Sequence, residues 1–369
     1  MNQKVKIAFT GGGTGGHVMP IIAIGREIKK INPEFELHYV GPKNYCAELF
    51  KEGFISHPII SGKIRGYFSL LNAVDLLFKI PLSFAQSFFI TLSVMPKLVF
   101  SKGGTGSLPV TFCAKILKIP VFIHESDSSP GKSNRITAKW AKKIFTSFEK
   151  TEYFNPQKII LAGNPIRKEL LERKGEEAQK IFNLSFKKPV VLISGGSLGS
   201  TAINDAIFSV LNKLLENYEV IHISGPGNYK KMIVGLRAFL GKGLREHYHL
   251  YEFLNEVQLK NAYAVSDIII GRAGASSIFE TAALGKPSII IPLPSSAHNH
   301  QLKNAYAYEK SGAAILKEQS NLGPNFFMGE IANVLSQKEK MKEAALRFAK
   351  PDAAEIIAKE IKEYLRSKI

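Results

Sequence analysis

Cysteine is almost absent from this 369-residue chain, and that scarcity excludes two classes of protein. Cys46 and Cys113 are too few for the disulfide framework of a small secreted domain, and they give no zinc-site spacing. We expect both thiols to be reduced and buried. The first apolar run begins at Val5, which leaves no room for a signal peptide and predicts a reducing cytoplasmic location.

Acidic residues are also in short supply. The chain has 31 Asp and Glu against 49 Lys and Arg, a net charge of +18. Such a balance favours an anionic partner: nucleic acid, acidic lipid or a phosphorylated substrate. Nucleic acid is not expected, because the sequence has no helix-turn-helix, RNA-recognition or zinc-finger signature and its basic residues are spread along the chain. The alternative is that the charge reflects a lysine-rich proteome and has no functional meaning.

A long apolar run is missing as well. The uncharged segment 80–96 is shorter than the ~20 apolar residues of a membrane span. It contains Gln86 and has a proline near each end, Pro81 and Pro96. We therefore reject a membrane-spanning helix and expect a core-packed helix at residues 84–92. Both membrane contact and burial remain open for residues 64–79, in which apolar side chains stand beside basic ones.

Residues 132–143 carry basic side chains, no acid and the chain's one tryptophan, Trp140. A basic helical face with an interfacial aromatic fits an anionic membrane surface. An ordinary solvated helix fits equally well, so both interpretations stay open.

Short β-rich runs alternate with longer helical ones, which predicts an α/β fold with parallel sheets covered on both faces. Strands are expected near residues 5–10, 36–40, 98–101, 120–124 and 144–147 in the first half, and near 189–194, 219–223, 249–251, 267–270 and 288–291 in the second.

The length favours two domains, and Gly163-Asn164-Pro165 is a turn signal and a plausible hinge. We predict an N-terminal domain at 1–163 and a C-terminal domain at 164–349. The helical, charged segment that follows, about 350–369, either ends the second domain or packs back on the first.

Four glycine-rich loops each follow a short apolar run, at residues 11–16, 103–107, 195–199 and 271–274. Glycine lets backbone N–H groups approach an anion at a helix N-terminus. Two such loops in each half predict two Rossmann-like domains that face one cleft and bind a nucleotide diphosphate. The first loop has neither the dinucleotide fingerprint nor the Lys-Ser/Thr ending of a P-loop.

His17 closes the first loop, at the edge of a parallel sheet where ligands usually bind. An imidazole with its usual pKa near 6.5 can take a proton from a hydroxyl there. The alternative is that His17 only braces the loop, in which case Glu125 or Asp127 becomes the candidate base.

An ordered set of motifs extends this interpretation: Gly12-Gly13-Thr14-Gly15-Gly16-His17, His124-Glu125, Gly163-Asn164-Pro165-Ile166-Arg167, Gly195-Gly196-Ser197-Leu198-Gly199, Arg272-Ala273-Gly274-Ala275 with Glu280, and His300-Gln301 with Asn304-Ala305. Over roughly residues 5–315 the chain resembles the MurG family of peptidoglycan glycosyltransferases, which add N-acetylglucosamine to lipid I to make lipid II. The resemblance implies a two-domain GT-B fold, a UDP-N-acetylglucosamine donor and an inverting reaction. It also implies peripheral attachment to the cytoplasmic face of the inner membrane, with cell-wall synthesis or division proteins as candidate partners.

The resemblance carries the donor site onto residues of both halves. Glu280 would accept both ribose hydroxyls, and the helix beginning near Gly274 would direct its N–H groups at the diphosphate; the alternative for Glu280 is a surface helix residue. Leu254 would contribute its backbone to the uracil edge while its side chain packs. The donor-binding residues implied are Thr14, Gly15, Gly16, Asp127, Arg167, Ser197, Leu254, Arg272, Ala275, Ser276, Ser277, Ile278, Phe279, Glu280 and Gln301.

The acceptor diphosphate is expected on the first two loops, at Gly12, Gly13, Gly103, Gly104 and Thr105. His17 would be the general base, with Glu125 as a second catalytic candidate. No Asp-x-Asp motif occurs, so neither a metal nor a cofactor is implied. The chain departs from the family at Asp127, where Asn is usual, and at Thr105, where an aromatic is frequent.

Two other functions share these features. A related transferase that glycosylates diacylglycerol has the same fold and donor helix, but it would not need two glycine loops suited to a diphosphate acceptor. A non-catalytic, membrane-bound sugar-nucleotide-binding scaffold would not need His17 together with Glu280.

Overall fold

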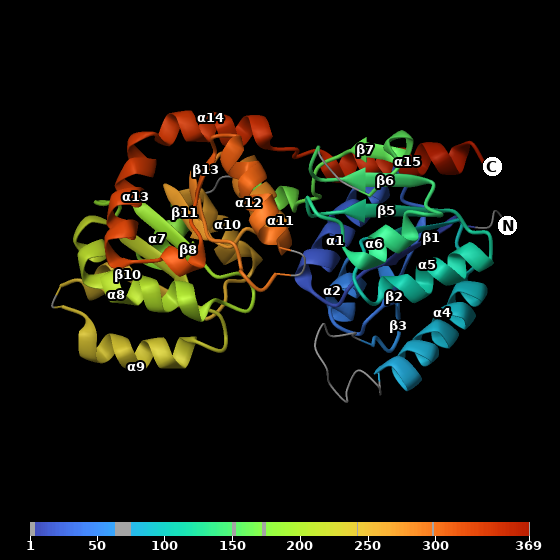
Figure 1. Cartoon of the computed structure of the whole chain (residues 1–369), viewed down its shortest axis with the longest axis horizontal. Coiled ribbons are helices and arrows are strands. Elements are labelled where there is room, and N and C mark those ends of the chain that lie inside the picture. The colour runs from blue at the N-terminus through green and yellow to red at the C-terminus, as the bar shows by residue number, and fades with distance from the viewer. Residues whose placement is uncertain are drawn as a thin grey trace. The chain divides into compact units, whose positions relative to one another are not determined.

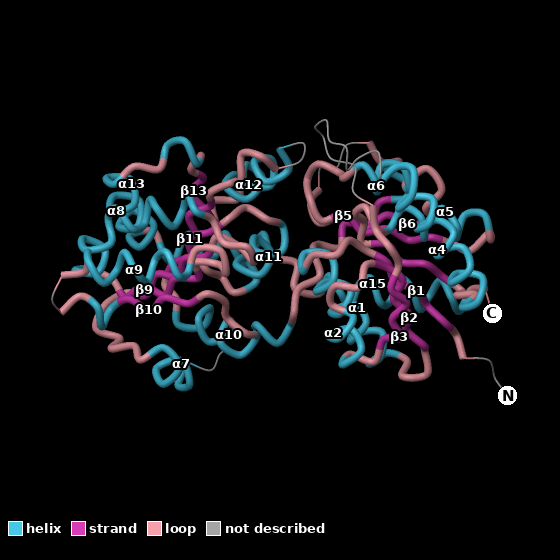
Figure 2. Tube along the Cα trace, turned by 90° about the horizontal axis from the view of Figure 1, so that it is seen from below, coloured by secondary structure: helices cyan, strands magenta, loops and turns pink. Residues whose placement is uncertain are grey.

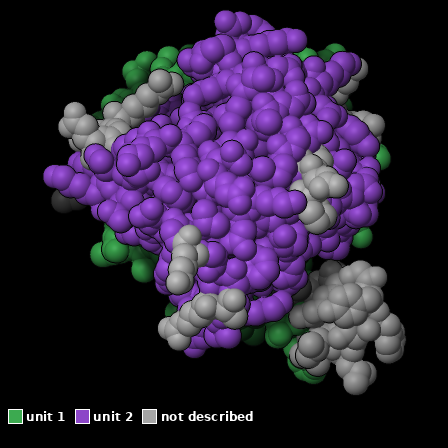
Figure 3. Space-filling model, turned by 90° about the vertical axis from the view of Figure 1, so that its left-hand side faces the viewer, with its two compact units in different colours: residues 1–166, 351–369 green, residues 167–350 purple. Residues whose placement is uncertain are grey.

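The computed structural model describes residues 4–62, 75–149, 153–171, 175–241, 243–296 and 299–368, and the chain forms two compact units. Unit 1 comprises Met1–Ile166 and Pro351–Ile369, and unit 2 comprises Arg167–Lys350 (Figure 3). The boundary after Ile166 leaves the Gly163-Asn164-Pro165 turn in unit 1 and assigns Arg167 to unit 2.

Unit 1 is built on a seven-stranded parallel sheet in the order β3-β2-β1-β4-β5-β6-β7 (Figure 1). Its central strands are buried on both faces, which explains their nearly continuous apolar sequences. The strands are β1 (Lys6–Thr10), β2 (Glu36–Gly41), β3 (Phe54–Pro58), β4 (Leu98–Ser101), β5 (Val121–Glu125), β6 (Lys143–Thr146) and β7 (Ile159–Leu161).

The helices of unit 1 cover the sheet on both faces. They are α1 (Gly15–Ile31), α2 (Cys46–Lys51), the π-helical turn η1 (Asp75–Lys79), α4 (Ile80–Val94), α5 (Ser107–Ile116), α6 (Lys132–Thr137), the 3-10 turn η2 (Pro156–Lys158) and α15 (Ala353–Arg366). Helix α15 packs beside α1, and Ile357 and Ile361 on it are fully buried in the core of unit 1. The C-terminal helix is therefore part of the first unit's core.

Unit 2 repeats the architecture with a six-stranded parallel sheet in the order β10-β9-β8-β11-β12-β13. Figure 2 shows the strands of both units enclosed by helices and loops. The strands are β8 (Val190–Ser194), β9 (Glu219–Ile223), β10 (Tyr248–Tyr251), β11 (Ile268–Gly271), β12 (Ser288–Ile290) and β13 (Ala314–Leu316). The helices are η3 (Lys168–Leu171), α7 (Gly175–Phe182), α8 (Thr201–Asn217), α9 (Tyr229–Phe239), η4 (Arg245–His247), α10 (Glu256–Val265), α11 (Ala275–Ala283), α12 (His300–Lys310), η6 (Gln319–Asn321), α13 (Pro324–Ser336) and α14 (Lys338–Phe348).

The ten expected strands are present, each with its ends within one residue of the expected position, but three further strands were not anticipated. These are β3, β7 and β13, and all three lie at a sheet edge. β3 reads Phe-Ile-Ser-His-Pro, while β7 and β13 have three residues each. Edge strands are short and half-solvated, so they carry little of the apolar signal that marks a central parallel strand.

The expectation of a core-packed helix at residues 84–92 is confirmed for Ile90, which packs against the core of unit 1, but wrong for Phe89 and Leu92. Helix α4 turns Ser83, Ser87 and Thr91 toward α5, and these small residues are buried. Phe89 is 68% exposed and Leu92 45% exposed on its outer side. The fully buried positions of α4 are thus mostly small residues, which let the two helices approach closely.

The segment 132–143 is also not a single helix. Helix α6 ends at Thr137, and Lys143 begins β6, where its ammonium pairs with Glu360 of α15. Trp140 packs against the core, and its indole N–H donates to the carbonyl oxygen of Thr111 at 3.2 Å. Lys139 and Lys142 are exposed. Of the other segment left open, residues 64–74 lie outside the described residues, while Leu77 and Phe78 are exposed.

Candidate active site

The four glycine-rich loops follow the four strands that flank the switch points of the two sheets. In unit 1 the chain runs from β1 outward to β3, then returns to the other side of β1 at β4; in unit 2, β8 and β11 have the same relation. Ligands of open parallel sheets bind at the carboxyl ends of strands beside such a switch point. Each unit therefore presents one pair of loops where a ligand is expected: 11–16 with 103–107, and 195–199 with 271–274.

Each of these loops leads into a helix whose first turn contains no acid. The helices are α1, α5, α8 and α11. The partial positive charge at each N-terminus is thus not offset by a carboxylate in that turn, which suits a phosphate group.

His17 lies between the two glycine loops of unit 1. A Cβ placed on Gly12 would lie 2.9 Å from His17 Nδ1, and one on Gly104 would lie 3.1 Å from Nε2. Gly104 also has a φ of +88°, a conformation that side chains disfavour. The Thr14 hydroxyl lies 2.8 Å from Nδ1 and fixes the ring. The imidazole is therefore held on both sides and at one nitrogen, and it is only partly exposed.

The electrostatic surroundings of His17 differ from those expected of an ordinary histidine. Burial and the nearby Lys102 ammonium lower the pKa of His17 to about 4, against a smaller opposing effect of Asp127. The expectation of a pKa near 6.5 is wrong for this reason. The imidazole is neutral at pH 7 and available as a proton acceptor.

Glu125 is a buried carboxylate that organises the loop after β5. One of its oxygens accepts from the backbone N–H of Asp127 at 3.0 Å, and the other accepts from Gly131 N–H at 3.1 Å and from the side chain of Asn134 at 2.9 Å. Burial and the negative charge of Asp127 raise its pKa, while the hydrogen bonds from Asp127 N–H and Asn134 and the charge of Lys102 act in the opposite direction. The carboxyl group is thus the acceptor that shapes the 126–131 loop.

The donor residues predicted in unit 2 gather around the start of α11. Gly274 is the N-cap, and the side chains of Ala275, Ile278 and Phe279 are buried in the core beneath the helix. Ser276 and Ser277 remain partly exposed in the first turn. What the helix offers a ligand is thus its backbone N–H groups and two serine hydroxyls.

Arg272, just before this helix, is held by neutral acceptors. Its guanidinium donates to the carbonyl oxygens of Ile291 and Pro292, to Ser200 Oγ at 2.5 Å and to Gln319 Oε1 at 2.7 Å. Burial lowers its pKa, yet from a value so high that the group stays charged. None of these four partners is a carboxylate, so they fix the guanidinium in place without neutralising it.

Glu280 is 9% exposed and already has two partners. Arg167 Nη2 donates to Oε1 at 3.1 Å, and the Tyr263 hydroxyl donates to Oε2 at 3.4 Å. Burial raises the pKa of Glu280 and Arg167 lowers it. Arg167 and Glu280 belong to the same unit. A ribose on Glu280 would therefore share the carboxylate with Arg167.

The other predicted donor residues are placed as follows. Ser197 is exposed in the loop after β8, and Gln301 lies in the first turn of α12, where its Oε1 accepts from Leu293 N–H at 2.9 Å. The Leu254 side chain packs in the core of unit 2 at 3% exposure, which leaves only its backbone for a ligand.

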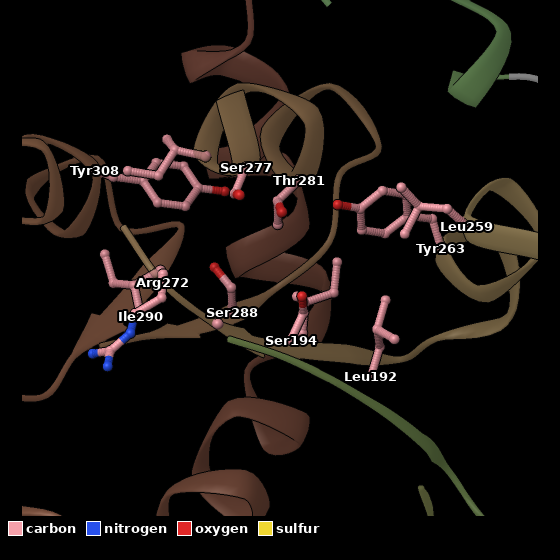
Figure 4. Close-up of a pocket in the computed structure, with 13 residues that line it drawn as sticks. Leu192, Ser194, Leu259, Tyr263, Arg272, Ser277, Thr281, Ser288, Ile290 and Tyr308 are labelled. Atoms are coloured by element: carbon pink, nitrogen blue, oxygen red, sulfur yellow. The ribbon is translucent and has the colours of Figure 1, made fainter. Parts of the chain in front are cut away.

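A small cavity with both apolar and hydroxyl-bearing lining residues lies beneath α11 (Figure 4). Its volume is about 30 Å³, room for about one water molecule, so a nucleotide cannot enter it. Hydroxyl groups of Ser277, Thr281 and Ser288 line it, whereas the guanidinium of Arg272 points away from it (Figure 4).

Family models match both halves of the chain. The glycosyltransferase family 28 N-terminal domain matches residues 7–146, and the family 28 C-terminal domain matches residues 190–359. A relative from Clostridium tetani, named UDP-N-acetylglucosamine–N-acetylmuramyl-(pentapeptide) pyrophosphoryl-undecaprenol N-acetylglucosamine transferase, is 36% identical over 342 residues, 92% of each chain. A relative of the same name from Clostridium kluyveri is 35% identical and covers 96% of this chain and 99% of its own. The chain belongs to the MurG family of glycosyltransferases.

The fold agrees with this membership. The crystal structure of Acinetobacter baumannii MurG matches with a TM-score of 0.72 at 23% identity, over 97% of this chain and 99% of that chain. The two parallel-sheet units thus form the GT-B fold that the resemblance to the MurG family implied.

Two residues of the site were not anticipated from the sequence. Tyr263 contacts Glu280 from α10, and nothing in its local sequence marks it. Lys102 lies beneath the glycine loops of unit 1 and is 2% exposed. A lysine directly between an apolar strand and a glycine loop was a signal that could have identified it. Among the described residues, no group of three or more His, Cys, Asp or Glu side chains is placed to hold a metal ion.

Proposed function

We propose that this chain transfers N-acetylglucosamine from UDP-N-acetylglucosamine to the 4-hydroxyl of N-acetylmuramic acid in lipid I, with inversion, to form lipid II. The observation that carries the proposal is a neutral, doubly flanked His17 between two glycine loops at the switch point of unit 1, in a chain of the MurG family. Such a site combines an anion cradle with a proton acceptor.

The acceptor diphosphate is assigned to Gly12, Gly13, Gly103, Gly104 and Thr105. The N-termini of α1 and α5 lie at these loops, and neither first turn contains an acid. In the tautomer this role requires, Nδ1–H of His17 donates to the Thr14 hydroxyl, and the unprotonated Nε2 takes the proton of the 4-hydroxyl.

The donor is assigned to unit 2, with the diphosphate at the N-terminus of α11 and beside Arg272. As the acceptor oxygen bonds to the anomeric carbon, the bond from that carbon to the UDP oxygen breaks and its electron pair stays on UDP. Backbone N–H groups, Ser197 and the fixed guanidinium of Arg272 stabilise the departing charge. Glu280 binds the ribose, and Gln301 contacts the sugar.

We further propose that the protein attaches to the cytoplasmic face of the membrane through unit 1. The segment Leu77–Val94 is long and apolar enough to span a membrane by length and composition, a weak criterion that core helices of soluble proteins also meet. Its outer face exposes Leu77, Phe78, Leu82, Phe89 and Leu92 while its small polar residues pack on α5. A helix that turns its large apolar residues outward suits the interfacial region of a bilayer.

A basic groove in unit 1 is a second feature that suits attachment to a membrane. It has a volume of about 1160 Å³ and lies at the amino ends of the unit 1 strands, at the edge of the sheet opposite the glycine loops. Its basic lining residues are Lys4, Lys97, Lys115, Lys118, Lys142, Arg366 and Lys368, against one acid, Glu34. This excess of positive charge favours an anionic membrane surface.

A transferase assay tests the proposal and separates it from its rivals. Purified protein is given UDP-N-acetylglucosamine with a soluble lipid I analogue, with diacylglycerol, or with no acceptor. We expect a β-linked disaccharide product only with the lipid I analogue. Product on diacylglycerol would favour the related lipid transferase, and UDP binding without product on any acceptor would favour a non-catalytic scaffold.

A further inference from the structure

Lys102 is a buried cation that the proposed mechanism does not use. It directly follows β4, and its backbone N–H donates to Thr10 O at 2.8 Å, which continues the pairing of β4 with β1. Its side chain is 2% exposed. The ammonium donates to Ser126 Oγ, in the loop after β5, and to Asn164 Oδ1 at 3.3 Å, in the turn that follows β7.

The charged and titratable groups that face Lys102 come from three segments. Glu125 and His124 end β5, Asp127 lies in the loop after it, and His17 lies in the first turn of α1. The two carboxylates favour the charged ammonium, while burial first and the ammonium second lower the pKa of both imidazoles. Lys102 also flanks the first loop, since a Cβ on Gly11 would lie 3.4 Å from His17 Cβ and 3.5 Å from Lys102 Cβ.

We propose that the Lys102 ammonium is a positioning group of the acceptor site, which ties the segments after β4, β5 and β7 together and supplies a fixed positive charge behind His17 and the two glycine loops. The inference rests on the proposed function only for its consequence in catalysis. The charge itself is a property of unit 1 and can be measured without substrate.

A lysine can be buried this deeply because the negative charges of two carboxylates offset part of the cost of removing its ammonium from water. Removing an ammonium from water is costly unless it is compensated, and here Glu125 and Asp127 supply negative charge while Ser126 and Asn164 accept its hydrogen bonds. Burial lowers the pKa of Lys102 to about 8, and the carboxylates act against this shift, so the group is mostly charged at pH 7. Asp127 is the position at which the chain departs from the family's usual Asn, and Lys102 offsets the added negative charge.

For His17 the consequence is that the proton acceptor stays unprotonated. A neighbouring cation disfavours the imidazolium, while Asp127 favours it, so the two residues act on His17 in opposite directions. If Lys102 only filled space, its neutral isostere would leave the protonation of His17 unchanged. The titration of His17 therefore distinguishes a charge effect from a packing effect.

The experiment is an NMR titration of the full chain labelled with ¹³C-histidine, with His17→Gln used to assign the His17 signal. We expect a midpoint at about pH 4 in the unmodified protein. It should rise by about one pH unit or more in Lys102→Met. It should fall in Asp127→Asn. Lys51→Met, which removes an exposed lysine of α2, is the matched control and should leave the midpoint unchanged.

A folded Lys102→Met protein with an unchanged His17 midpoint would overturn the inference. If that variant does not fold because Glu125 loses its counter-charge, the double variant Lys102→Met with Glu125→Gln removes both charges, and the midpoint should still rise. A return to the original midpoint in the double variant would also overturn the inference. Failure of the transferase assay with an intact His17 shift would instead count against the proposed reaction alone.

Discussion

His17 is held by Thr14 and flanked by Gly12 and Gly104, so its ring position does not depend on a bound ligand. A positioned general base contributes about 10²–10⁴-fold to a rate. His17→Ala should therefore lower kcat by about that factor while UDP affinity stays nearly unchanged, because the donor residues proposed around α11 belong to the other unit. Steady-state kinetics and calorimetry of UDP binding measure the two quantities. Loss of UDP affinity with retained turnover would make His17 a loop brace.

The same residue sets an expectation for pH. With a folded-state pKa of about 4, the basic form of His17 is fully present at neutral pH and is lost only as the pH falls through about 4. We therefore expect His17 to cause no decrease of kcat/KM near pH 6.5. Any decrease at that pH should also be present in His17→Ala. A limb at that pH, absent from the variant, would contradict the lowered pKa.

Glu280 is the residue at which the predicted role and the observed contacts compete. Its carboxylate binds Arg167 and Tyr263, and a ribose would add a third partner. Charge-assisted hydrogen bonds contribute about 1.5–3 kcal/mol, so Glu280→Ala should weaken UDP binding by roughly tenfold to a hundredfold. Tyr263→Phe, which removes only the 3.4 Å contact, is the control and should bind UDP nearly normally. Calorimetry that gives equal affinities for Glu280→Ala and the unmodified protein would remove Glu280 from the donor site.

Among single residues, the sequence predicted those that lie in the glycine motifs. It did not predict Lys102, which lies beside these loops in the folded chain. The first loop and His17 share a segment of chain, so their proximity follows from chain order. Lys102, Ser126 and Asn164 meet only because parallel strands bring their carboxyl ends to one edge. The pKa of His17 is lowered first by burial and then by the Lys102 charge, and neither could be inferred from the first loop alone.

Among the elements, α4 is the one whose orientation the sequence left undetermined. An apolar helix beside a parallel sheet usually packs through its large side chains. In α4, which packs against α5, the small residues Ser87 and Thr91 are buried instead. The composition of a helix shows how apolar it is, but it does not determine which face is buried, because that also depends on the shape of the neighbouring element. The three edge strands were missed for a similar reason. Each is identified by its pairing with a neighbouring strand rather than by an apolar pattern in its own sequence.

The exposed face of α4 gives a prediction for membrane binding. Phe89→Ser with Leu92→Ser should reduce cosedimentation with vesicles that contain anionic lipid, because both side chains are exposed apolar groups on one helix. Val234→Ser, at an exposed apolar position on α9 of unit 2, is the control and should bind like the unmodified protein.

A charge variant tests the basic side chains separately. Lys139→Glu with Lys142→Glu should weaken binding by roughly 1 kcal/mol per residue at low salt and by less at high salt. Lys143 is excluded from this variant because it pairs with Glu360 inside unit 1. Unchanged cosedimentation of both the apolar and the charge variants would place the membrane contact on another surface.

Over the whole molecule, the return of the chain from unit 2 to unit 1 makes α15 part of the first core. Ile361 is fully buried against that core although it lies near the end of the sequence. Ile361→Ala should cost about 2–5 kcal/mol of unfolding free energy. Leu346→Ala, at a 46% exposed position on α14 of unit 2, is the control and should cost much less. Denaturant unfolding measures both, and a small effect of Ile361→Ala would show that α15 contributes little to stability.

A ligand allows the two units to be distinguished in the same unfolding experiment. If UDP is held by unit 2, saturating UDP should stabilise that unit, by about 2.7 kcal/mol at a hundred times its dissociation constant. Unit 1 should gain little, since its core of β1, β4 and α15 contains none of the residues proposed around α11. The site of the stabilisation can be followed by hydrogen exchange, where amides of β8 and β11 should become better protected than those of β1 and β4. Equal protection of both sheets would mean that UDP binding is not confined to unit 2. Protection of β1 and β4 alone would indicate that UDP binds at the loops around His17. The assignment of donor and acceptor to the two units would then have to be reversed.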